Sequence, residues 1–117
     1  MQNEKKYKTF SSFYPYYLTE HADMRNRILH FCGTALLLVF LTAGIITGKL
    51  WLFIAIPLTG YGFAWAGHFF LEKNRPATFT YPLYSLGADF VMFWHMLTGK
   101  IGNKLREANQ INHVNTL

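Results

Sequence analysis

The sequence predicts an all-α fold, a small transmembrane helical bundle built on an N-terminal helical hairpin. Two observations support this. Hydrophobic residues make up 51% and aromatic residues 18% of the 117 positions, which is more apolar surface than a soluble domain of this length usually buries. In addition, residues 31–48 and 50–67 contain no charged side chain, and each run is close to the roughly 20 residues that a helix needs to cross a bilayer.

The hairpin follows from the spacing of these two runs. Only Lys49 separates them, and Gly48 precedes it, so the chain reverses direction within a tight turn. The first run begins at residue 31 and the second follows at once, which is not the pattern of a secretory signal peptide. We therefore expect two antiparallel helices.

A third apolar stretch spans residues 78–98, but it contains Pro82, Gly87 and Asp89. These residues leave two alternatives open, a third crossing or a re-entrant segment that dips into the membrane and returns. We expect residues 1–108 to form a single membrane-embedded domain and residues 109–117 to form a frayed, disordered tail.

Basic residues flank the predicted spans and explain the net charge of +5 without nucleic acid as a partner. The positive-inside rule predicts that the N-terminus and the segment GHFFLEKNRP (67–76) lie on the cytoplasmic side and Lys49 outside, in the inner membrane if the protein is bacterial. A third crossing would put the basic residues near the C-terminus on the opposite side, against that rule. The residues that carry this argument are Lys5, Lys6, Lys8, Arg25, Arg27, Lys73 and Arg75, with Lys100, Lys104 and Arg106 at the C-terminal end.

Histidines meet at one end of this hairpin. Residues at equal distance from the turn lie at the same depth, so His30 and His68 face the same membrane boundary. Glu72 follows His68 by four residues and Asn26 precedes His30 by four, a spacing that places each pair on one helix face. Neutral imidazole and carboxylate are typical ligands of non-haem iron, and the segment GHFFLEKNRPATF (67–79) supplies both.

His21 can join this group only if the first helix begins after it. Asp23 is a suitable N-cap residue, which would leave Glu20 and His21 on the preceding loop, free to fold back. The residues alone also allow two other sites. One is a hydrogen-bonded clasp of His30, His68 and Glu72 without metal, and the other is a haem held by two histidines on neighbouring helices.

Two long segments resemble the small membrane family typified by the fungal 2-hydroxy fatty acid dioxygenase. They are YYLTEHADMRNRILHFCGT (16–34) and GYGFAWAGHFFLEKNRPATFTYPLYSLGADFVMF (60–93), and together with their surroundings they cover most of the chain. The matching pattern comprises His21, Asn26, His30, Gly67, His68, Glu72, Lys73, Arg75, Pro76 and Ala77. The resemblance implies an Fe(II)-dependent α-oxidation that uses dioxygen and shortens a long-chain 2-hydroxy fatty acid by one carbon.

Given this resemblance, we expect His21, His30 and His68 to be the metal ligands. Glu72 is expected as a fourth ligand or as the carboxylate that fixes an imidazole tautomer, and Asn26 as a residue that orients the site. Positive side chains are expected to hold the substrate carboxylate; these are Arg25, Lys73 and Arg75.

Our expectations for the remaining polar and aromatic residues are less specific. Asp89 has either a role in the site or a role as a polar anchor, and His95 is expected at the membrane interface rather than as a ligand. Interface belts are expected to contain the aromatic residues Tyr14, Tyr16, Tyr17, Trp51, Trp65 and Trp94.

Overall fold

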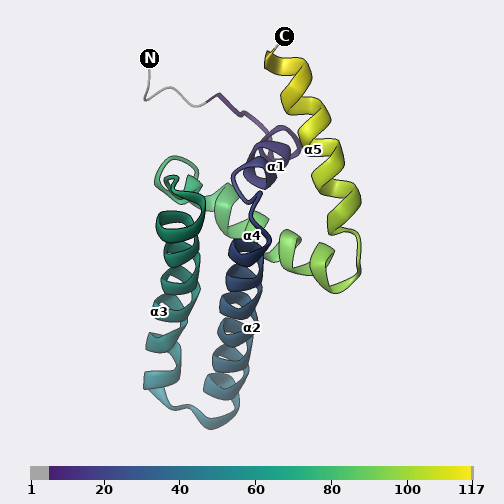
Figure 1. Ribbon diagram of the computed structural model, residues 1–117. Coiled ribbons are helices and arrows are strands. Elements are labelled where there is room, and N and C mark those ends of the chain that lie inside the picture. The colour runs from purple at the N-terminus through teal and green to yellow at the C-terminus, as the bar shows by residue number, and fades with distance from the viewer. Residues whose placement is uncertain (1–5, 117) are drawn as a thin grey trace.

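The computed structural model describes residues 6–116, so Lys5 and Leu117 lie outside it (Figure 1). Nearly all of this part of the chain is helical, which confirms the all-α prediction. In order, the elements are α1 (Phe10–Thr19), α2 (Met24–Thr47), α3 (Leu50–Ala66), a π-helical turn η1 (Gly67–Glu72), a 3-10 turn η2 (Ala77–Phe79), α4 (Pro82–Leu97) and α5 (Ile101–Thr116).

The hairpin of α2 and α3 is present as predicted, with the two helices side by side along their length (Figure 1). Gly48 ends α2 in the left-handed conformation, with φ of 71°, which glycine adopts without steric cost. At the other end, Asp23 caps α2 by accepting a hydrogen bond from the backbone N–H of Arg25. His21 therefore lies on the loop before α2, as expected.

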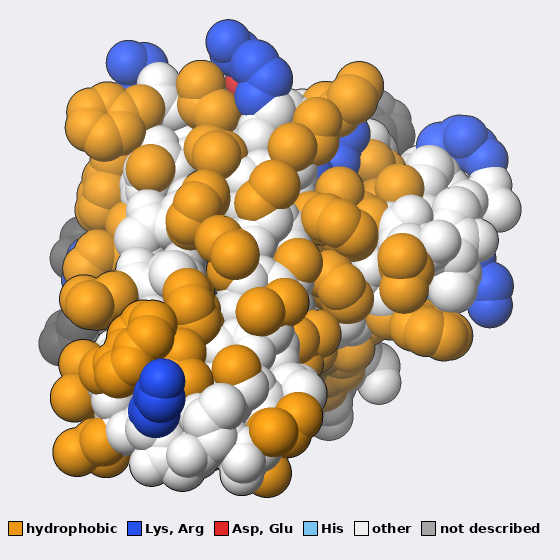
Figure 2. All heavy atoms as spheres, turned by 90° about the horizontal axis from the view of Figure 1, so that it is seen from below, with side chains coloured by type: hydrophobic (Ala, Val, Ile, Leu, Met, Phe, Trp, Pro, Cys, Tyr) orange, Lys and Arg blue, Asp and Glu red, His pale blue; other side chains and the backbone are white. Residues whose placement is uncertain are grey.

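Two helical stretches of the described chain, Met24–Thr47 and Leu50–Glu72, are long and apolar enough to cross a membrane by length and composition. Only 22% and 17% of their most apolar windows are buried within the protein, whereas a core helix of a soluble protein buries most of its apolar surface. Figure 2 shows hydrophobic side chains over most of the surface seen from below, with most Lys and Arg side chains toward its margins.

Helices α1, α4 and α5 gather at the end of the hairpin opposite its turn (Figure 1). Their buried residues, together with Ala77 of η2 and Tyr81 just before α4, form the main hydrophobic core. Helix α4 has 16 residues, fewer than a span needs, and it lies across the end of the hairpin. The structure thus favours a third apolar segment that does not cross the membrane. The core consists of Phe13, Tyr14, Tyr17, Leu18, Ala77, Tyr81, Ala88, Met92 and Ala108.

Two sequence-based expectations differ from this arrangement. Tyr14 and Tyr17 are buried in the core, with 8% and 2% exposure, because α1 packs them against α4 and α5; they do not form an interface belt. Helix α5 continues to Thr116 and so includes much of the segment expected to be frayed. The division into one domain and a tail stays a prediction.

Candidate metal centre

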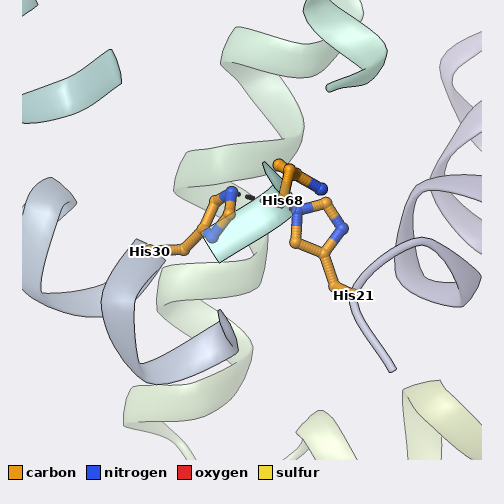
Figure 3. Close-up of side chains that lie close together, drawn as sticks. All are labelled: His21, His30 and His68. Carbon is orange, nitrogen blue, oxygen red and sulfur yellow. Dashed lines mark hydrogen bonds between the residues drawn. The ribbon is translucent and has the colours of Figure 1, made fainter. Parts of the chain in front are cut away.

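Three histidines converge from three segments at the end of the hairpin (Figure 3). His21 lies on the loop before α2, His30 in the second turn of α2, and His68 in η1. All three side chains are buried, and one ring nitrogen of each lies within 4.8 Å of the others. The cluster can therefore hold a metal ion.

Local backbone structure brings each ring to this point. The Arg27 guanidinium donates hydrogen bonds to the carbonyl oxygens of His21, at 2.7 Å, and Ala22, at 2.9 Å, and so holds the loop against α2. The π-helical turn carries His68, and the backbone N–H of Asn74 donates to the His68 carbonyl at 3.0 Å. Lys73 adopts the left-handed conformation, with φ of 57°, which ends this turn and reverses the chain. Such π-helical turns are often found at functional sites.

Each imidazole donates its Nδ1–H to an oxygen acceptor. The acceptors are the Tyr17 carbonyl for His21, at 2.6 Å, and the Asn26 carbonyl for His30, at 3.0 Å. For His68 the acceptor is Asn74 Oδ1, at 2.7 Å.

The orientation of the Asn74 amide is fixed, because its nitrogen donates to the Glu20 carbonyl at 3.0 Å. A neutral imidazole with a proton on Nδ1 has none on Nε2. All three histidines therefore present an unprotonated Nε2, the form that binds metals.

Two of these Nε2 atoms, those of His21 and His30, are 3.1 Å apart. Neither carries a proton in the neutral tautomers, so their lone pairs repel. A proton shared between them is unfavourable as well, because burial and the two neighbouring histidines hold the pKa of His21 well below its usual range. Two nitrogen ligands at about 2.1 Å from a metal and at right angles are about 3.0 Å apart, so a cation fits this spacing and removes the repulsion.

Glu72 connects two segments of the site. Its Oε1 accepts hydrogen bonds from the backbone N–H of Asp23, at 2.6 Å, and from Asn26 Nδ2, at 3.3 Å. Glu72 therefore does not fix an imidazole tautomer, because the carbonyl oxygens of Tyr17 and Asn26 and Asn74 Oδ1 accept from the imidazoles. Glu72 instead links the start of α2 to the end of η1.

Asn26 contacts the site in two ways. Its carbonyl orients His30, while its buried side chain packs against Gly67, where a Cβ atom would overlap Asn26 Oδ1. Glycine at this position allows η1 to approach α2 closely.

The three basic residues expected to hold a substrate carboxylate lie at the surface. Arg25 pairs with Asp23 at 2.8 Å and its side chain is 71% exposed. The Arg75 guanidinium lies 4.9 Å from the centre of the Phe79 ring, and Lys73 is exposed. The structure does not bring these side chains to the imidazoles.

Two neighbouring spaces lie beside the histidines. A cavity of about 20 Å³ is lined by His30, His68, Ser85 and Asp89, among others. A groove of about 230 Å³ runs between α2, α3 and α4. His30 and Asp89 line both, together with Tyr61, so the cavity at the imidazoles adjoins the groove.

The sequence indicates a role for neither Asn74 nor Ser85, and it leaves the role of Asp89 open. Asp89 accepts a hydrogen bond from the Tyr17 hydroxyl, and burial raises the pKa of its carboxyl to about 6 despite this bond. Asn74 is in the GHFFLEKNRP segment, six residues after His68, but helical spacing did not indicate the pair, because a π-helical turn and a reversal bring them together. His95 lies apart from the three histidines, and its Nδ1 is 2.8 Å from the Tyr14 hydroxyl.

Comparison with known proteins identifies the family of this chain. No curated protein and no solved structure matches the chain. A family model described as 2-hydroxy-palmitic acid dioxygenase Mpo1-like matches residues 7–101, a segment that extends from before α1 to the start of α5 and contains all three clustered histidines. The chain therefore belongs to the 2-hydroxy-palmitic acid dioxygenase Mpo1-like family.

Proposed function

We propose that this protein is an integral membrane Fe(II)-dependent dioxygenase that shortens a long-chain 2-hydroxy fatty acid by one carbon. The observation that carries the proposal is the convergence of three unprotonated Nε2 atoms at the polar end of an apolar groove. The family match supports the same reaction class.

The donor set suits a non-haem iron site. Imidazole nitrogen is a common ligand of Fe(II), and His21, His30 and His68 would hold the ion while Tyr17, Asn26 and Asn74 keep the rings in orientation. When bound, Fe(II) supplies redox chemistry with dioxygen, which zinc lacks. A 2-hydroxy acid carries hydroxyl and carboxylate oxygens on adjacent carbons, and both are suitable donors to a divalent cation.

The hairpin places this chemistry at a membrane boundary. If α2 and α3 span the bilayer, the histidines lie near its surface, because they are at the end of the hairpin away from Gly48. An acyl chain in the groove gains about 0.8 kcal/mol for each buried methylene, while its head group reaches the imidazoles.

We place the N-terminus and the loop at residues 73–76 on the cytoplasmic side, in the inner membrane if the protein is bacterial. This orientation rests on the positive-inside rule. The exposed Arg25, Lys73 and Arg75 would then attract an anionic substrate to the boundary through long-range electrostatics, rather than bind its carboxylate at the metal.

Two alternatives are less compatible with the geometry. A haem between His30 and His68 needs free space between their rings, but the His21 ring lies 4.4 Å from both ring centres. A clasp without metal leaves the short Nε2 to Nε2 approach of His21 and His30 uncompensated. The hydrogen bonds of Glu72 do join the two segments, so a clasp and a metal site are compatible.

The proposal is tested by incubating the iron-loaded protein aerobically, in mild detergent, with 2-hydroxyhexadecanoic acid. We expect release of the acid one carbon shorter, in step with oxygen consumption, and no product from hexadecanoic acid. Chelation should abolish turnover, and Fe(II) but not Zn(II) should restore it. Iron-replete protein that shortens no 2-hydroxy acid of any chain length would contradict the proposed reaction while leaving the metal site in place.

A further inference from the structure

Ser85 on α4 has a polar group without a partner. Its side chain is buried, with 4% exposure, and its Oγ makes no hydrogen bond within the described part of the chain. A buried hydroxyl without a partner is costly, and native proteins rarely leave one. An unpaired hydroxyl beside a cavity therefore indicates that a ligand in the cavity supplies its hydrogen-bond partner.

The cavity beside Ser85 is the one that reaches the imidazoles. Ser85, Asp89, His30 and His68 all line it, and Ser85 and Asp89 are four residues apart, on one face of α4. Its volume of about 20 Å³ holds little more than one small polar group. Asp89 Oδ1 accepts from the Tyr17 hydroxyl, which leaves Oδ2 able to accept from a ligand.

The adjoining groove has a different character. Apart from Asp89 and His30 at its polar end, its lining is largely apolar, with Leu37, Ile56 and Phe90 among the residues. Its volume of about 230 Å³ is smaller than that of the usual pocket for a compact, drug-sized ligand. Because it lies between α2, α3 and α4, a flexible chain dissolved in the membrane can reach it.

We propose that Ser85 and Asp89 bind the polar head of the fatty acid substrate and that the groove takes its acyl chain. Ser85 Oγ–H donates to a carboxylate oxygen in the cavity, and Asp89, which lines both the cavity and the groove, accepts from the 2-hydroxyl. This assignment rests on the proposed function. It also predicts selectivity for a 2-hydroxy acid over the acid without the hydroxyl, because a site built to bind a hydroxyl rejects an analogue that would leave the buried acceptor unpaired.

Gly60 limits the space available to the chain. It lines the groove with Leu37, and a Cβ atom at position 60 would lie 3.3 Å from Leu37 Cδ1. A leucine at this position would therefore fill part of the groove. Gly62, two residues further along α3, has no heavy atom within 4 Å of such a Cβ, so Gly62→Leu is a matched control.

The inference is tested by equilibrium binding of labelled 2-hydroxyhexadecanoic acid to the iron-loaded protein under nitrogen, where no turnover occurs. We expect Ser85→Ala to weaken binding at least about tenfold, the loss typical of a hydrogen bond to a charged group. Asp89→Asn should reduce the preference for the 2-hydroxy acid over hexadecanoic acid. Iron content should be unchanged in both variants, and the exposed Ser11→Ala should bind as the wild type does.

The groove is tested with the same assay at two chain lengths. Gly60→Leu should weaken binding of the 16-carbon acid more than that of an 8-carbon 2-hydroxy acid, whereas Gly62→Leu should affect neither. Wild-type affinity in iron-replete Ser85→Ala, or no binding of either acid by the wild-type protein, would overturn the inference. Binding that depends on Ser85 and Gly60 in a protein that shortens no acid would instead overturn the proposed reaction and leave this inference standing.

Discussion

Asn74 offers a direct test of how the chain holds its histidines. Its Oδ1 accepts from His68 Nδ1 at 2.7 Å, and its Nδ2 donates to the Glu20 carbonyl at 3.0 Å. Asn74→Ala removes both hydrogen bonds. The His68 ring then loses the acceptor that keeps the proton on Nδ1 and the lone pair on Nε2.

The expected loss can be estimated from similar sites. Removing the partner of a metal-binding histidine typically reduces metal affinity about 10 to 100-fold, which corresponds to about 1.4 to 2.7 kcal/mol. We expect Asn74→Ala to fall in this range, because one of three ligands is released from its orientation while the other two keep theirs. Removing His68 itself should cost considerably more.

Metal affinity is measured by competition with a coloured chelator in mild detergent. Asn74→Asp separates the two hydrogen bonds, because a carboxylate still accepts from His68 but cannot donate to Glu20; we expect it to bind metal more tightly than Asn74→Ala. The exposed Asn109→Ala serves as a control that should match the wild type. An Asn74→Ala protein with wild-type affinity would refute the reasoning.

Three further predictions concern neighbouring residues. Gly67→Ala should lower the free energy of unfolding by about 1 to 3 kcal/mol, the usual cost of overpacking, because the added Cβ overlaps Asn26 Oδ1; chemical denaturation measures this. Glu72→Gln should retain metal, because an amide oxygen can still accept from the Asp23 N–H; loss of metal would indicate that Glu72 is a ligand. Finally, burial lowers the pKa of His21 in the folded protein, so below about pH 6.5 the unfolded chain binds more protons. The metal-free protein should therefore lose stability as the pH falls from about 7.5 to 5.5, and His21→Ala should lose less; equal pH dependence of the two would contradict this.

The hairpin and the three histidines could be predicted from the sequence because simple rules determine them. Bilayer-length runs around Gly48 fix the depth of His30 and His68, and Asp23 marks where α2 begins, which leaves His21 on the loop. These rules depend on spacing along the chain and on regular helical geometry.

The residues that hold the rings could not be predicted in the same way. Asn74 reaches His68 only because the chain forms a π-helical turn and reverses at Lys73, and regular helical spacing contains neither feature. The position of Ser85 beside the imidazoles depends on α4 crossing the end of the hairpin, a tertiary arrangement without a local signal. Similarly, the aromatic pattern predicts an interface belt for Tyr17, because it does not show that α1 packs against α4.

The central claim is that His21, His30 and His68 together hold one iron ion. Metal analysis tests it most directly, on protein purified in mild detergent without a nickel column. We predict about one iron per chain in the wild type and in His95→Ala, whose imidazole lies outside the cluster, and loss of iron in His30→Ala and His68→Ala proteins that still insert into the membrane. Full iron occupancy in His68→Ala would contradict the account.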